Sequence, residues 1–179
     1  ATSVKDLSRI WLNFPTLAGH LWFMYPLISV YLFIPIVSPW ISKASAKEER
    51  FFIVLFLVST CMPYLNRVAG EVWGQCFWNE YHMLWYFSGY LGYLVLAHYI
   101  RVHLTWSRSK RLWGGGLLMV IGALWTIYSF YCQAVPGEIL STPVIEIGWA
   151  FCTINCVLLT AGTFLIFSTI KAPSAPRWV

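Results

Sequence analysis

Apolar residues along the chain are gathered into five long blocks, separated by short polar segments. The blocks cover residues 17–37, 51–65, 83–100, 112–135 and 143–170. A helix needs roughly 20 apolar residues to cross the hydrocarbon core of a bilayer, within a range of about 17–25. Four blocks reach that length easily, whereas the second must borrow flanking residues. The pattern therefore predicts about five transmembrane helices in this chain.

The apolar blocks are continuous and do not alternate with polar residues, as residues 51–58 illustrate. In lipid, every backbone N–H and C=O must be paired within the protein, which allows only helices or a closed barrel. Barrel strands would alternate apolar and polar residues. We therefore predict an all-α fold, a polytopic helix bundle that forms a single membrane domain over residues 1–179 and has the lipid bilayer as its partner.

The composition supports lipid as the solvent of this protein. Apolar residues make up 59% of the chain and charged residues only 11%, whereas a soluble domain carries about a quarter charged residues. The net charge of +5 would suggest nucleic acid as a partner of a soluble protein. No nucleic-acid-binding motif accompanies this charge, so we predict that the protein does not bind nucleic acid.

Lysine and arginine are distributed unevenly between the two sides of the predicted bundle. Nine lie in the first–second loop, the third–fourth loop or the C-terminal tail, and three lie on the other side. Because short cytoplasmic loops are enriched in these residues, the asymmetry places the first group in the cytoplasm. The nine are Lys43, Lys47, Arg50, Arg101, Arg108, Lys110, Arg111, Lys171 and Arg177, and the three are Lys5, Arg9 and Arg67.

Polar side chains on the outer side are the candidates for binding a substrate, because polar groups in a membrane are costly without a partner. His20 stands at the outer start of the first block, and Trp22 and Tyr25 follow within about one and a half turns. Their aromatic faces and polar tips suit a sugar ring. Glu80 and His82 lie in the aromatic-rich outer loop between the second and third blocks. The alternatives are an interfacial histidine bonded to a carbonyl for His20, and ordinary loop polarity for Glu80 and His82.

Two further polar residues are singled out by their position. Arg101 ends the third block next to the bundle, and is the best candidate for binding the phosphates of a cofactor. The alternative is that it only marks the cytoplasmic side. Asn155 lies in the middle of the fifth block, where we predict that it forms a hydrogen bond with a neighbouring helix.

The cysteines do not indicate a metal centre. The five cysteines include no CxxC motif, and no His/Cys cluster has the spacing of a zinc site. The sequence therefore predicts no metal. Cys76 and Cys132 both fall on the predicted outer side, where they would pair only if that compartment is oxidising.

Two segments resemble signatures of a known enzyme family. Residues 19–36 open with Gly-His-Leu-Trp-Phe and continue to Tyr31-Leu, with Pro35 four residues after the tyrosine. Residues 89–99 read Gly-Tyr-Leu-Gly-Tyr-Leu-Val-Leu-Ala-His-Tyr. The first segment is similar to the HLWFL-type opening of the multipass membrane acyltransferases of the acyltransferase-3 group, close to the O-acetyltransferase branch. The second is similar to a GYLGYFLLGYY-like helix of that group, with Ala97 and His98 in place of Gly-Tyr.

The resemblance extends over nearly the whole chain and implies a function. It implies transfer of an acyl group, usually acetyl from acetyl-CoA or another acyl-CoA, to a sugar hydroxyl of a cell-envelope glycan or a lipid-linked precursor. The enzyme would lie in the inner membrane of a bacterium. His20 corresponds to the histidine of the HLWF motif, and we expect it to line the acceptor cavity and not to act as the principal base.

The resemblance also shows which family features this chain lacks. The catalytic histidine of the family lies in its first helix, within an Arg/Lys-to-His pattern that no segment here matches, and the closing helix of the family is missing too. We therefore expect an internal and C-terminal portion that is inactive alone, with His20 as its candidate catalytic residue. The rival interpretations are a small multipass transporter or permease, with His20 and Asn155 lining the path, and a structural membrane subunit.

Overall fold

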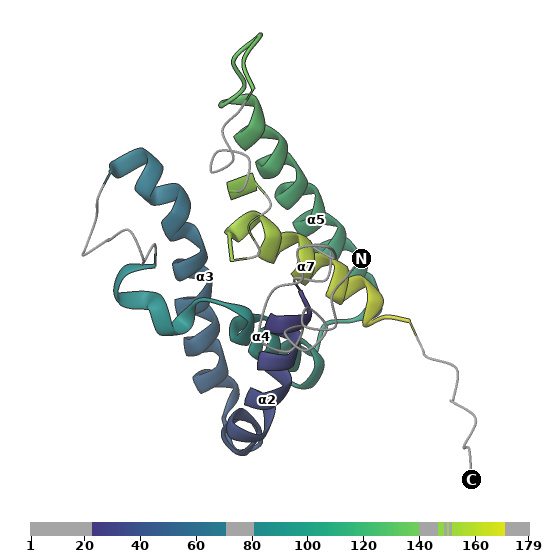
Figure 1. The fold of residues 1–179 in the computed structure, drawn as a ribbon. Helices are drawn as coiled ribbons and strands as arrows, with labels where there is room; N and C mark the ends of the chain where they lie inside the picture. The colour runs from purple at the N-terminus through teal and green to yellow at the C-terminus, as the bar shows by residue number, and fades with distance from the viewer. Residues whose placement is uncertain (1–22, 71–80, 140–146, 149, 151, 171–179) are drawn as a thin grey trace, which may run out of the picture. The chain divides into compact units, whose positions relative to one another are not determined.

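The structure, a computed structural model, describes residues 23–70, 81–139, 147–148, 150 and 152–170. Within these residues there are five α-helices, one 3₁₀ helix and no strand. The helices are α2 (Met24–Ile41), α3 (Ala46–Ala69), η2 (His82–Phe87), α4 (Tyr90–Val102), α5 (Arg108–Tyr131) and α7 (Ile154–Phe167) (Figure 1). The predicted all-α fold is confirmed.

Three of the described helices have the length and hydropathy of membrane spans. They are α2 with 18 residues, and α3 and α5 with 24 residues each. Large apolar side chains face outward on these helices, for example Leu32 of α2 and Leu117 of α5. Outward-facing apolar side chains are costly in water but suit a lipid environment. The protein is therefore a helical membrane protein, as the hydrophobic blocks predict.

The third predicted segment, residues 83–100, is not a single helix. The 3₁₀ helix η2 ends at Phe87, and α4 starts only at Tyr90. Gly89 between them has a φ of 92°, a backbone conformation that glycine adopts much more readily than other residues. At 1.5 Å per residue, the 13 residues of α4 span about 20 Å. This helix is therefore shorter than the hydrocarbon core, whose thickness is about 30 Å.

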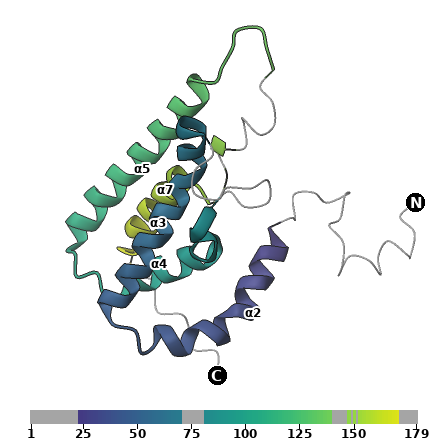
Figure 2. The same ribbon diagram turned by 90° about the vertical axis from the view of Figure 1, so that its left-hand side faces the viewer.

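The chain forms two compact units, residues 1–43 and 44–179. Helix α2 belongs to the first unit, and Pro35 and Pro39 lie inside it. Proline removes a backbone donor and clashes with the preceding turn, which explains why α2 is bent in Figure 2. The other described helices belong to the second unit, which holds the candidate site.

Glycines let the helices of the second unit approach one another closely. A Cβ atom on Gly115 of α5 would lie 2.7 Å from the carbonyl oxygen of Gly162 in α7, and one on Gly162 would lie 2.6 Å from the carbonyl oxygen of Gly115. In the same way, the ring of Phe56 in α3 occupies the space beside Gly92 of α4. Small residues at these crossings allow the close backbone contact that holds membrane helices together. Accordingly, α5 and α7 lie side by side (Figures 1 and 2).

Asn155 connects three helices through a buried hydrogen-bond network. Its side chain is fully buried. The Nδ2 atom donates to Thr126 Oγ1 of α5 at 2.9 Å and to the Gly148 carbonyl at 2.7 Å, and Tyr64 of α3 donates to its Oδ1 at 3.0 Å. The predicted hydrogen bond between Asn155 and a neighbouring helix is therefore confirmed. Because its amide is satisfied within the bundle, it serves to hold the helices in register.

The start of α3, the end of α4, the start of α5 and the end of α7 come together at one end of the second unit. Arg111 at the start of α5 donates to the Leu104 carbonyl at 2.6 Å and to Ser168 Oγ, just after α7, at 2.9 Å. We call this the basic end. Its basic side chains are Lys47, Arg50, Arg101, Arg108, Lys110 and Arg111.

Candidate functional site

A fully buried carboxylate lies in the first turn of α3. Ser45 and Glu48 form a capping box at this helix start, in which the Ser45 N–H donates to the Glu48 carboxylate at 2.7 Å. The neighbouring Glu49 points into the bundle and has an exposed fraction of 0%. It shares the buried face of α3 with Ile53 and Phe56, at the spacing of one side of a helix. The helix therefore turns Glu49 inward, where the positive end of its dipole favours the negative charge.

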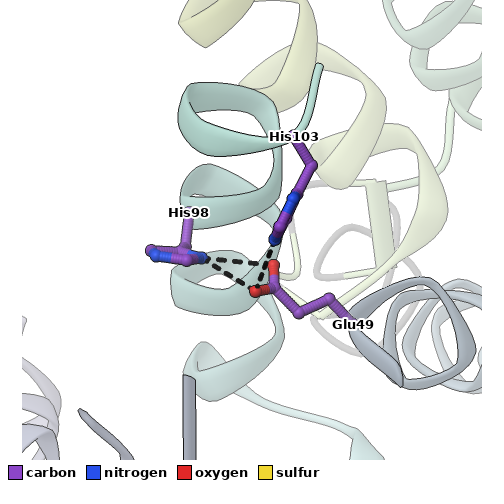
Figure 3. Close-up of side chains that lie close together, drawn as sticks. All are labelled: Glu49, His98 and His103. Carbon is purple, nitrogen blue, oxygen red and sulfur yellow. Dashed lines mark hydrogen bonds and ion pairs between the residues drawn. The ribbon is translucent and has the colours of Figure 1, made fainter. Parts of the chain in front are cut away.

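Two histidines from α4 reach the Glu49 carboxylate (Figure 3). His98 Nδ1 lies 3.0 Å from Glu49 Oε1 and 3.2 Å from Oε2. His103 is the C-cap residue of α4, and its Nε2 lies 3.2 Å from the same Oε1. The exposed fractions of the two histidine side chains are 31% and 24%, respectively. The cluster Glu49–His98–His103 is thus buried on the carboxylate side and accessible on the imidazole side.

The Glu49 carboxylate has only imidazoles as its ion-pair partners in the described part of the chain. These are His98 and His103, and no described lysine or arginine takes part. A buried carboxylate is costly unless it is paired or bound to a metal. The C-terminal end of α4, which carries the two histidines, also favours positive charge. Both the buried carboxylate and the C-terminal end of α4 therefore favour a positive charge at this place. That charge can be a protonated imidazole or a cation bound between the two imidazoles.

The cluster can do two kinds of chemistry. An imidazole held by a carboxylate can exchange a proton near neutral pH, as a general acid or base does. Alternatively, the three side chains can bind a metal, because one ligand atom from each lies within 4.8 Å of the other two. Two histidines and one carboxylate form the ligand set of several zinc sites.

The basic side chains around this cluster differ in whether they form hydrogen bonds within the fold. Arg111 donates to two backbone carbonyls, of Leu104 and Trp106, and to Ser168, so it fixes the loop between α4 and α5. Arg101 is exposed in the last turn of α4. Among the described residues, no acid forms an ion pair with Arg101. Arg101 is therefore available to an anionic ligand, whereas Arg111 is used by the fold.

The structure describes only part of the predicted substrate-binding group. His20, Trp22 and Glu80 lie outside the described residues, and the side chain of His82, at the start of η2, is also outside the description. Tyr25 is half-buried in the first turn of α2. The roles predicted for these five residues remain predictions.

The structure describes one of the two cysteines that the sequence places on the outer side. Cys132 is an exposed free thiol, whereas Cys76 lies outside the described residues.

Sequence reasoning missed Glu49 as a site residue and treated His98 only as a departure from a motif. A usable signal was present, because Glu49, Ile53 and Phe56 follow the spacing of one helix face. A carboxylate on the apolar face of a membrane helix requires a partner. The partner could not be identified from spacing, since His98 is 49 residues away.

Comparison with known proteins identifies a family to which nearly the whole chain matches. The acyltransferase-3 family model, described as an acyltransferase domain, matches residues 2–179. No curated protein and no solved structure gave a match.

Proposed function

The chain belongs to the acyltransferase-3 family and is a membrane acyltransferase chain, and on that premise we propose a specific reaction. The complete protein transfers an acetyl or other acyl group from acyl-CoA to a sugar hydroxyl of a cell-envelope glycan or a lipid-linked precursor. It does so in the bacterial inner membrane. In this reaction the hydroxyl oxygen forms a bond to the acyl carbon, the carbon–sulfur bond breaks, and the hydroxyl proton ends on the thiol of CoA.

The proposal rests on one observation, which is that the Glu49–His98–His103 cluster lies at the basic end. Acyl-CoA combines phosphates, which arginine and lysine bind well, with a thioester, whose reaction requires proton transfer or polarisation of a carbonyl. The basic end offers both kinds of group within a few turns of helix. Neither a transporter path nor a purely structural subunit requires this combination.

We place the donor at the basic end, with its thioester extending into the bundle, and let the acceptor enter from the opposite side, so that its hydroxyl meets the thioester within the protein. The basic asymmetry of the loops supports a cytoplasmic basic end, and the cytoplasm is where acyl-CoA is made. The acceptor would meet His20, Trp22 and Tyr25, with Glu80 and His82 as further contacts. His20 would line the acceptor cavity and accept or donate a hydrogen bond to a sugar hydroxyl.

The alternative of a small transporter placed two residues, His20 and Asn155, along a polar path, and Asn155 does not fit that role. It requires Asn155 to face a polar path, whereas the Asn155 amide is fully buried and hydrogen-bonded to Thr126, Gly148 and Tyr64. Every buried side-chain polar atom in the described part of the chain also has a partner. No observation on the described residues favours transport.

Arg101→Ala is expected to raise the apparent KM for acetyl-CoA by about tenfold, because a charge-assisted hydrogen bond contributes about 1.5–3 kcal/mol. The kcat should change little, since the phosphates are bound equally in the ground and transition states. The KM and kcat are measured with the full-length protein by varying the concentration of acetyl-CoA, and the kcat is expressed per folded molecule.

The matched control removes an arginine from the opposite end of the same unit. Arg67 is near the end of α3 and donates to Gln133, so Arg67→Ala deletes the same charge without touching the basic end. Its KM for acetyl-CoA should stay unchanged. If the two variants had the same KM for acetyl-CoA, Arg101 would have no part in binding the donor. Its charge would then only mark the cytoplasmic side of the bundle.

A further inference from the structure

We infer that Glu49, His98 and His103 form a binding site for a transition-metal dication of the zinc type. The ligand atoms are Glu49 Oε1, His98 Nδ1 and His103 Nε2. All three lie within 4.8 Å of one another, and both nitrogens converge on the same carboxylate oxygen (Figure 3). Two imidazoles and one carboxylate leave a fourth position open, as catalytic zinc sites do.

The distances are close to those that a zinc ion requires. With Zn–N and Zn–O bonds of about 2.0–2.2 Å, ligand atoms in a tetrahedral site lie about 3.3–3.5 Å apart. The two nitrogens lie 3.0 and 3.2 Å from Glu49 Oε1. The three ligand atoms together lie within 4.8 Å of one another, so an ion between them requires the imidazoles and the carboxylate to rotate until all three separations approach the tetrahedral value.

The charge of the site favours a cation. Glu49 is fully buried in the first turn of α3, and in the described part of the chain its partners are two histidines, with no lysine or arginine among them. A divalent ion would neutralise the carboxylate directly, which is one of the two ways in which buried charges are tolerated. Nitrogen and oxygen ligands together favour zinc and its neighbours in the transition series over magnesium or calcium.

The site is accessible from the surface. The histidine side chains keep exposed fractions of 31% and 24%, so an ion can enter from the imidazole side while the carboxylate stays buried. The ligands also sit on rigid elements. His98 belongs to α4, Glu49 belongs to α3, and the ring of Phe56 against Gly92 fixes the contact between the two helices.

Metal binding is independent of the proposed reaction, whereas its chemical role rests on that reaction. A bound zinc ion acts as a Lewis acid toward a carbonyl oxygen, and the thioester carbonyl of the proposed donor is such a group. The alternative is a purely hydrogen-bonded cluster, in which each imidazole N–H donates a hydrogen bond to the carboxylate. That alternative predicts no stoichiometric metal.

The experiment uses the full-length protein, purified in detergent and stripped with a chelator. Zinc is titrated in competition with a chromophoric chelator, and the bound metal is counted by elemental analysis. We expect one zinc ion per chain. Substitution with cobalt should give the visible absorption of a four-coordinate site, and Glu49→Gln, His98→Gln and His103→Gln should each weaken binding by at least about 100-fold.

The controls separate this site from adventitious binding. Glu48→Gln removes the neighbouring exposed carboxylate of the same turn, and His82→Gln removes a histidine of η2. Both should retain the metal. The inference is overturned if the wild-type protein takes up no stoichiometric zinc, whatever its acyltransferase activity. It is also overturned if the Glu48→Gln and His82→Gln variants lose the metal as fully as the three ligand variants do.

Discussion

Glu49→Gln is expected to lower acyl transfer by the full-length protein by at least about 100-fold per folded molecule. The glutamine side chain has nearly the same volume, but it replaces a carboxylate that accepts from both histidines by an amide with only one acceptor oxygen. His98 and His103 would lose their common partner and the negative charge that holds them. Activity is then lost in either case, whether the imidazoles exchange a proton or bind a metal. The measurement is kcat and KM for acetyl-CoA.

The neighbouring glutamate provides the control for this prediction. Glu48→Gln changes an exposed residue of the same helical turn, whose role is to complete the capping box with Ser45. It should keep nearly full activity and lose at most about 1 kcal/mol of stability. If both variants retained wild-type activity, the Glu49 cluster would have no part in acyl transfer.

The second large effect concerns the crossing of α5 and α7. Gly115→Ala is expected to destabilise the protein by about 1–3 kcal/mol, because overpacking of a filled contact has this cost. The added Cβ would lie 2.7 Å from the Gly162 carbonyl oxygen and 2.8 Å from a side-chain carbon of Ile166. Both contacts are too short, and the oxygen belongs to backbone that cannot rotate away. Thermal unfolding in one fixed detergent measures the loss.

Gly116→Ala is the matched control, since it makes the same chemical change one residue further along α5. A Cβ atom there would meet nothing within 4 Å. Alanine has the higher helix propensity by up to about 1 kcal/mol, so this variant should melt at or slightly above the wild-type temperature. Equal melting temperatures for the two variants would show that α5 and α7 do not cross at Gly115.

The helical segments could be predicted from the sequence because each one follows from a local rule. Continuous apolar blocks in lipid must be helices, and the blocks at 51–65 and 112–135 correspond to α3 and α5. The break before α4 was not predicted. It depends on the left-handed backbone of Gly89, whereas hydropathy counts only which residues are apolar.

The candidate site was less predictable because its parts are distant in the chain. Arg101 could be chosen from its position at the edge of a block, and Asn155 from its depth in another. The Glu49–His98 contact joins residues 49 positions apart. It depends on how α3 and α4 pack, which in turn depends on the fit of the Phe56 ring against Gly92. No spacing rule contains that information.

In the proposed reaction, the basic end faces the cytoplasm and binds the acyl donor. Sealed vesicles that contain the full-length protein and its endogenous glycan acceptor test on which side of the membrane the donor binds. Labelled acetyl-CoA, which does not cross the bilayer, is added outside to inverted or to right-side-out vesicles. Label should pass to the acceptor in the inverted vesicles, where the cytoplasmic face is exposed, and not in the right-side-out vesicles. Transfer in right-side-out vesicles that equals or exceeds transfer in inverted ones would show that the donor does not bind on the cytoplasmic side.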